Sequence, residues 1–235
     1  AGGAAGAALS FAALRVMENE LRDFRLGGAE LGSADKARFM AIRERLSQIS
    51  SRFADNLLDA TNAFSHFVTD PAAVAGIPQD VLEAAREAAI ADGRQGWKFT
   101  LHAPSYIPVL QYADNRRLRE LMYREYVTRA AEFGKAEWDN TPLIAEILAL
   151  RRELAQLLGF ANYAEYSLAP KMADTPQQVL EFLNELATRA KPYAQRDLDE
   201  VTAFAKTELG LPKLGRWDLA YASEKLRVAP YAFLY

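Results

Sequence analysis

The stretch from residue 142 to residue 173 constrains the fold more than any other part of the chain, because it encodes two helices and the corner between them. Apolar side chains recur every three or four residues in its first half, which is the spacing of a helix with one buried face. They are Leu143, Ile144, Ile147, Leu148, Leu154, Leu157 and Leu158. A helix of this kind packs on other helices, so the stretch predicts a helical protein.

The corner itself is encoded by a stop signal followed by a start signal. Gly159 follows the last apolar turn, where a left-handed residue commonly ends a helix, and Phe160 stands where its side chain can pack back on Leu154. Asn162 can cap the next helix, and Glu165 can return a hydrogen bond in a capping box. We therefore expect a sharp turn between two helices here.

The same three-and-four spacing of apolar residues predicts helices along most of the chain. They cover residues 10–26, 33–57, 79–92, 106–112, 115–127, 175–209 and 217–227. We expect the first two to pair as an antiparallel hairpin. Pro192 falls inside the helix that begins after Thr175, where a proline removes a backbone donor, so we expect a kink there.

Two short segments interrupt this helical pattern. WKFTL at residues 97–101 alternates apolar and polar side chains as a strand does, and FSHFVT at residues 64–69 ends at Asp70 and Pro71. The two segments can pair as an antiparallel ladder that leans on helices, because two strands alone are marginally stable. The predicted fold is therefore mostly α, a bundle-like body of several helices with antiparallel helix hairpins and at most one two-stranded ladder.

The domain organisation follows from breaks in this pattern. Residues 1–10, rich in alanine and glycine, read as a linker-like tract, and Gly134 followed by WDNTP marks the clearest internal break. We expect a helical subdomain with the β ladder at residues 11–134 and a second helical subdomain at residues 135–235. Together they should form one continuous body.

Composition excludes several classes of partner. A net charge of −3 gives no electrostatic reason to bind nucleic acid or an anionic membrane, and no apolar run approaches the ~20 residues of a membrane span. We interpret Arg116, Arg117 and Arg119 as the solvated face of a helix. The absence of cysteine excludes disulfides and thiolate metal sites. It fits a reducing compartment but does not establish one, since secreted proteins without cysteine also exist. The cytoplasmic location that we expect goes with the resemblance described next.

Several segments of the chain resemble a known family. They are LRDFRLGGAEL (21–31), RLSQISSRFADNLLDATNAF (45–64), PSYIPVLQYADNRRLRELMYREYVTRA (104–130), WDN (138–140), LLGFANYAEYSLAPKMADTPQQVLEFLNELA (157–187) and WDLAYASEK (217–225). In this order they resemble the zinc oligopeptidases of the thimet oligopeptidase and oligopeptidase A group. The resemblance implies a mostly helical, deep-channelled metallopeptidase that cleaves short peptides and excludes folded proteins.

The zinc chemistry implied by the resemblance needs residues that this sequence does not contain. In the family, two histidines of an HExxH helix and a later glutamate hold zinc, and the motif glutamate acts as general base. The chain has no HExxH, and its two histidines, His66 and His102, lie far apart in sequence. We interpret both as structural or surface residues. We therefore assign no catalytic residue and no metal ligand, and the substrate-binding residues are unknown.

Two functions remain open from the sequence. The first is part of a zinc-dependent oligopeptidase that supplies scaffold and channel wall, matches the region before the zinc helix and lacks the catalytic zinc motif. On this hypothesis the 235-residue chain alone is inactive, binds no zinc tightly, needs a C-terminal catalytic portion as partner and self-associates through exposed apolar faces. The alternative is a non-enzymatic helical module that binds peptides or other proteins.

Overall fold

The computed structural model describes residues 10–229, which form two compact units. The first combines residues up to 52 with residues 142–187, and the second combines residues 53–141 with the chain from 188 onward. Each unit is thus assembled from segments on both sides of residue 134, and the subdomain boundary expected there stays a prediction. The linker-like tract at residues 1–10 lies outside the described residues except for Ser10, which caps the first helix.

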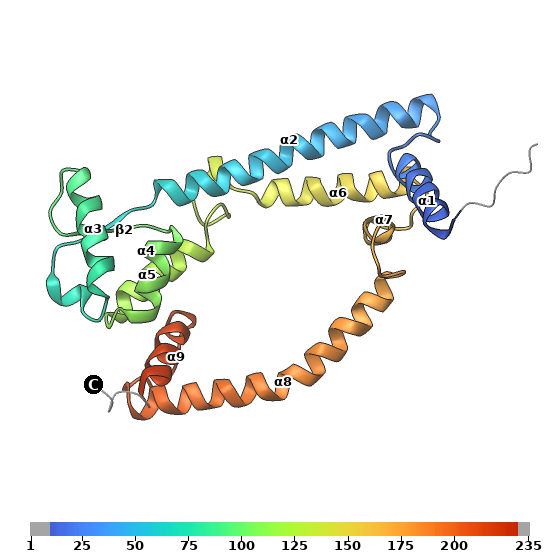
Figure 1. The fold of residues 1–235 in the computed structure, drawn as a ribbon. Coiled ribbons are helices and arrows are strands. Elements are labelled where there is room, and N and C mark those ends of the chain that lie inside the picture. Colours follow the sequence, from blue (N-terminus) through green and yellow to red (C-terminus); the bar gives the residue numbers. More distant parts are fainter. Residues whose placement is uncertain (1–9, 230–235) are drawn as a thin grey trace, which may run out of the picture. The chain divides into compact units, whose positions relative to one another are not determined.

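Helices make up most of the described residues, so the prediction of a mostly α fold is confirmed (Figure 1). The α-helices are α1 (Phe11–Leu26), α2 (Ser33–Ala63), α3 (Gln79–Ala91), α4 (Ala103–Tyr112), α5 (Arg116–Val127), α6 (Thr141–Leu157), α7 (Tyr163–Leu168), α8 (Pro176–Thr207) and α9 (Leu219–Val228). Short 3-10 helices are η1 (Pro71–Val74), η2 (Ala136–Trp138) and η3 (Arg216–Asp218). Across residues 10–229, every helix is too short or too polar to cross a membrane.

In the first unit, α2 packs in the antiparallel sense against α6. Arg38 pairs with Glu153, and Arg45, two turns later on α2, pairs with Glu146, two turns earlier on α6. Between the helices lies a small core of fully or almost fully buried side chains, namely Phe39, Ile42 and Leu154. Unlike α2, helix α1 has no buried residue.

The antiparallel partner of α2 is therefore α6, and the expected hairpin of α2 with α1 is wrong. The apolar stripe on α2 predicts one buried face, and Phe39, Ile42 and Ile49 on that face are buried. Its spacing is the same whichever helix covers it, so it cannot identify the partner.

The corner between α6 and α7 forms as the sequence predicts. Gly159 adopts the left-handed conformation with φ of 81°, and the backbone N–H of Phe160 donates to the carbonyl of Ala155 at 2.9 Å. Asn162 caps α7 by accepting a hydrogen bond from the backbone N–H of Glu165 at 3.0 Å. The Glu165 carboxylate in turn accepts a hydrogen bond from the backbone N–H of Ala161, one residue before the cap, which is a variant of the capping box.

The second unit contains the expected β ladder. Strand β1 (His66–Val68) pairs antiparallel with β2 (Trp97–Phe99), with His66 opposite Phe99 and Val68 opposite Trp97. Helix α3 packs on β2, and α4 packs on α3, α5 and α9. The main hydrophobic core of this unit includes Val68, Val74, Ile77, Trp97, Phe99, Leu101, Val109, Leu110, Leu118 and Met122. The ladder is short, so these helices stabilise it.

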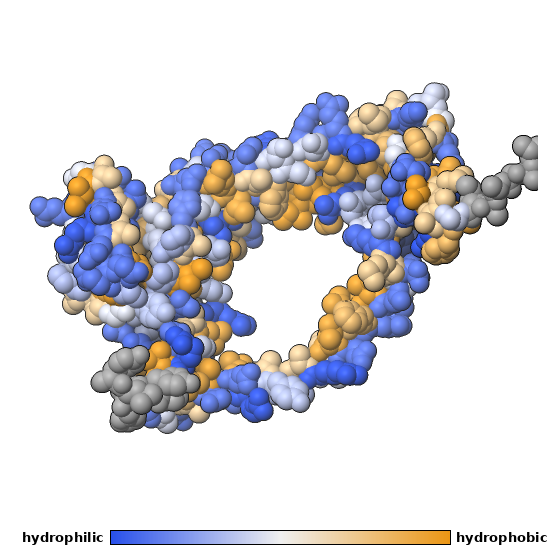
Figure 2. Space-filling view, in the orientation of Figure 1, coloured by the Kyte–Doolittle hydropathy of each residue, from blue (hydrophilic) through white to orange (hydrophobic). Residues whose placement is uncertain are grey.

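Helix α8 continues through Pro192 without ending (Figure 1). Its start is capped as expected, because the Thr175 hydroxyl accepts a hydrogen bond from the backbone N–H of Gln178 at 3.2 Å. Apolar side chains line one side of α8 and hydrophilic ones the opposite side (Figure 2). In the first half of the helix, Leu180 and Phe182 are more than half exposed.

Two glycines in the turn between α3 and β2 give a direct test of the ladder. Gly93 and Gly96 both have positive φ, but a Cβ on Gly96 would meet the Val68 carbonyl oxygen at 2.2 Å, whereas a Cβ on Gly93 meets nothing within 4 Å. Both Gly93→Ala and Gly96→Ala place an alanine in the left-handed region, which costs about 1–2 kcal/mol of unfolding free energy. Gly96→Ala adds a steric clash with the backbone at the end of β1. We expect a clearly larger loss of unfolding free energy for Gly96→Ala in urea titrations. Equal losses would contradict the register.

Candidate functional site

A buried ionic cluster surrounds Asp218, whose side chain is fully buried at the junction of η3 and α9. Its carboxylate accepts hydrogen bonds from Nη2 of Arg116 at 2.7 Å and from Nη2 of Arg119 at 2.8 Å. Nε of Arg116 also donates to it at 3.0 Å, and the backbone N–H of Gly215 donates at 2.8 Å. Both arginines lie on α5, 102 and 99 positions earlier in the chain. The cluster therefore joins α5 to the segment around η3 and α9.

Arg119 is the second buried charge of this cluster, with 1% of its surface exposed. Its Nη1 donates to the carbonyl of Ala113 at 2.6 Å, and its Cζ lies 3.9 Å from the ring centroid of Tyr221. The Tyr221 hydroxyl in turn donates to the Asp114 carboxylate at 2.8 Å. Burial, together with this bond to Asp114, raises the pKa of Tyr221 to about 12. The phenol is therefore a hydrogen-bond donor at neutral pH.

Hydrogen bonds keep the Asp218 carboxylate ionised although its side chain is buried. Burial opposes ionisation, but the hydrogen bonds from Arg116, Arg119 and the Gly215 N–H outweigh it and hold the pKa of Asp218 below its ordinary value. Because this pKa is lower in the folded chain, ionised Asp218 adds stability above the unfolded-state pKa of about 4. That contribution is lost as the pH falls through the folded-state pKa.

Our interpretation of Arg116, Arg117 and Arg119 as a solvated basic face is therefore wrong for Arg119 and incomplete for Arg116. Arg117 is exposed, whereas Arg116 donates to the buried aspartate. The sequence carries a signal for this outcome: Arg119 lies beside Leu118 and one turn before Met122, on the apolar side of the helix. Its buried partner could not be found from spacing, because it is 99 positions away.

A second buried polar contact involves Asn140, the last residue of the WDN segment. The side-chain Nδ2 of Asn56 on α2 donates to Oδ1 of Asn140 at 2.9 Å, and Nδ2 of Asn140 donates to the carbonyl of Phe53 at 3.0 Å. Both asparagines are more than nine-tenths buried. The contact fixes the start of α6 against α2, a role that the sequence did not indicate.

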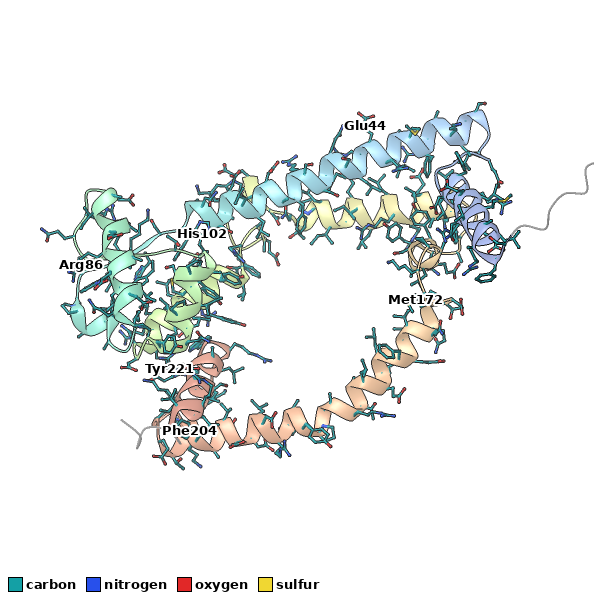
Figure 3. The ribbon with its side chains drawn as sticks, in the orientation of Figure 1. Glu44, Arg86, His102, Met172, Phe204 and Tyr221 are labelled. Atoms are coloured by element: carbon teal, nitrogen blue, oxygen red, sulfur yellow. The ribbon has the colours of Figure 1, made fainter. Side chains whose placement is uncertain are left out.

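The two histidines do not come together. His66 lies in β1 opposite Phe99, and His102 stands at the N-cap of α4, beyond the end of the ladder (Figure 3). Burial lowers the pKa of His66, which favours a neutral ring. Within residues 10–229, no group of three His, Asp or Glu side chains is placed to hold a metal. These residues therefore do not fit a catalytic zinc, which needs about three protein ligands.

The chemistry of the Asp218 cluster suits positioning. Its carboxylate pairs with both guanidinium groups, and the backbone carbonyls of Ala113 and Lys213 accept further hydrogen bonds from them. Nε of Arg119 is buried without a hydrogen-bond partner, and the Tyr221 ring covers this guanidinium. A buried ion pair of this kind fixes geometry, since removing one partner leaves the other charge unpaired in the interior. The cluster therefore holds α4, α5 and α9 in place.

Comparison with known protein families places the same region in a defined group. Residues 109–234, more than half of the chain, match "Peptidase family M3". The chain belongs to peptidase family M3. The resemblance to the thimet oligopeptidase and oligopeptidase A group is thereby confirmed, and the matched segment of this M3 chain contains the whole Asp218 cluster.

Curated M3 relatives match nearly the whole chain. It is 48% identical over 228 residues to "Oligopeptidase A" of Salmonella typhimurium, which covers 96% of this chain and 34% of the relative. The identity to "Oligopeptidase A" of Escherichia coli is also 48%, with the same coverage. "Probable cytosolic oligopeptidase A" of Arabidopsis thaliana is 38% identical over 232 residues, 95% of this chain and 32% of the relative. The chain thus spans about a third of the length of these relatives.

Proposed function

We propose that this chain is part of a zinc-dependent oligopeptidase that hydrolyses short peptides, and that its residues supply scaffold and channel wall. Membership of peptidase family M3 carries the proposal, supported by the names of relatives at 46–48% identity. The compartment proposed is the cytoplasm, in keeping with a chain without cysteine.

The metal-binding residues are proposed to lie outside these 235 residues. The sequence lacks HExxH and has only two histidines, which lie on separate elements of the second unit. The contribution of this chain is then to hold helices in the geometry that a peptide channel requires. The Asp218 cluster contributes most to this geometry, because its buried pair of Asp218 with Arg119 joins α5 to α9 and to the end of α4.

Exposed apolar side chains support packing against further polypeptide. Phe11, Leu14, Met17, Leu21 and Phe24 follow one stripe of α1, and each is at least 46% exposed. Stripes of this length are unusual on a free surface, and they favour association. In the proposed enzyme, the catalytic portion covers such surfaces, and the 235-residue chain by itself self-associates.

A chimera tests the proposal. The segment of Escherichia coli oligopeptidase A that aligns with this chain is replaced by the chain, and hydrolysis of a quenched fluorescent peptide is measured with and without a chelator. We expect zinc-loaded chimera to cleave the peptide and the chelator to abolish cleavage, whereas the 235-residue chain alone should neither cleave nor retain zinc after dialysis.

Two outcomes would contradict the proposal. A folded, zinc-loaded chimera that leaves the peptide intact argues against a role in peptide hydrolysis and favours a helical module that only binds peptides or proteins. Chelator-sensitive cleavage by the 235-residue chain alone would place the metal site within it. Circular dichroism and zinc analysis of the chimera separate a failure of function from a failure to fold.

A further inference from the structure

An open pocket of about 270 Å³ lies in the second unit, away from the Asp218 cluster. It is lined by the end of α2, by Leu101 after β2, and by the end of α5 with the segment that follows it. Leu101 is 2% exposed and Phe133 is 76% exposed, so the lining runs from the core to the surface. Phe64 and Trp138 add two more aromatic side chains. Such a surface favours a ligand with a hydrophobic side chain.

Arg129 brings a fixed positive charge to this lining. Its Nη1 donates to the Thr61 hydroxyl at 2.9 Å, its Nε donates to the carbonyl of Tyr126 at 2.8 Å, and its Cζ lies 3.6 Å from the Tyr126 ring centroid. The Tyr126 ring is itself stacked on Tyr106 at 4.0 Å. Among the described residues, no carboxylate lies within ion-pair distance of Arg129. The guanidinium is therefore held in place with its charge uncompensated.

Lys135 adds a second cation on the exposed side of the pocket. Its Nζ lies 4.3 Å from the ring centroid of Trp138, and its ion pair with Glu137, at 4.0 Å, is long and exposed. The carboxylate in the lining is Glu125, an exposed residue near the end of α5. The lining itself thus holds two cations and one carboxylate, and Glu137 offsets Lys135 in part from outside the lining. Arg129 is the cation of this lining that no described carboxylate pairs with.

We infer that this pocket binds a carboxylate carried next to an apolar side chain, which is the chemistry of a free hydrophobic amino acid and of the C-terminal residue of a short peptide. Arg129 binds the carboxylate through charge-assisted hydrogen bonds, since its geometry is fixed before the ligand arrives. Phe64, Phe133 and Trp138 pack on the side chain. The inference rests on the pocket alone and does not require the proposed hydrolysis.

The test is direct binding to the 235-residue chain, measured by titration calorimetry and by the change in tryptophan fluorescence. N-acetyl-phenylalanine should bind roughly tenfold or more tightly than N-acetyl-phenylalaninamide, because only the acid offers a charged acceptor. Arg129→Gln and Lys135→Gln should each remove much of this preference. Arg117→Gln is the matched control, an exposed arginine outside this pocket whose loss should leave binding unchanged.

Arg129→Gln also loses contacts to Thr61 and Tyr126, so the exposed Lys135 and Phe133 provide variants that do not disturb the core. Phe133→Ala should weaken the binding of N-acetyl-phenylalanine more than the binding of N-acetyl-alanine. Tighter binding of phenylalanine than of N-acetyl-alanyl-phenylalanine assigns the ligand as a free amino acid, and the reverse order assigns a peptide terminus. Equal binding of acid and amide, or no binding by the folded chain, overturns the inference whatever the chimera does.

Discussion

Replacing Asp218 by alanine is expected to lower the free energy of unfolding by about 3–5 kcal/mol. The variant leaves Arg119, which is 1% exposed, without its anionic partner in the interior. It also removes acceptors for Arg116 and for the Gly215 N–H. A loss of this size is a large share of the 5–15 kcal/mol that typically stabilises a domain.

An exposed ion pair on the same helix provides the control for this experiment. Glu120 pairs with Arg124 at 2.9 Å, and both side chains are at least 36% exposed. Glu120→Ala should cost at most about 1 kcal/mol, because solvent screens such pairs. Urea titrations followed by circular dichroism compare the two variants. Equal losses of unfolding free energy in the two variants would show that the contribution of Asp218 to stability does not come from its burial.

The pH dependence separates the charge of Asp218 from its shape. Asp218→Asn keeps the shape but removes the ionisation, so the stability difference from the parent chain should be largest above about pH 4. It should shrink at lower pH, since the parent then also protonates this carboxyl as the pH falls through its lowered pKa. A difference that stays constant down to pH 2 would contradict an ionised Asp218.

Local patterns in the sequence predicted the elements well and their partners poorly. The ladder of residues 64–69 with residues 97–101 was found because alternation and flanking prolines are local signals, and the α6–α7 corner was found from a glycine and a cap. The Asp218 cluster joins residues about a hundred positions apart, and apolar spacing carries no information on such pairs. Arg119 shows the difference, because its place on the apolar side of α5 was visible but its partner was not.

Apolar spacing also did not identify α6 as the partner of α2. The core between these two helices gives the second prediction of a large loss of stability. Phe39 is fully buried in the small core that α2 forms with α6, and few other fully buried side chains share that core. Phe39→Ala removes a large apolar side chain and leaves a cavity, which typically costs about 3–5 kcal/mol. In a core this small, few other buried contacts remain to stabilise the folded unit after such a loss.

We therefore expect Phe39→Ala to abolish hydrogen-exchange protection in the first unit, in the backbone amides of residues 36–52 and 144–157. Peptides from the core of the second unit, around Phe99 and Met122, should keep their protection, because that core is built from other residues. Met40→Ala is the matched control, since the neighbouring Met40 is 60% exposed and its loss should change little. Equal loss of protection in both units would show that they unfold together, and the small core would then be stabilised by the large one.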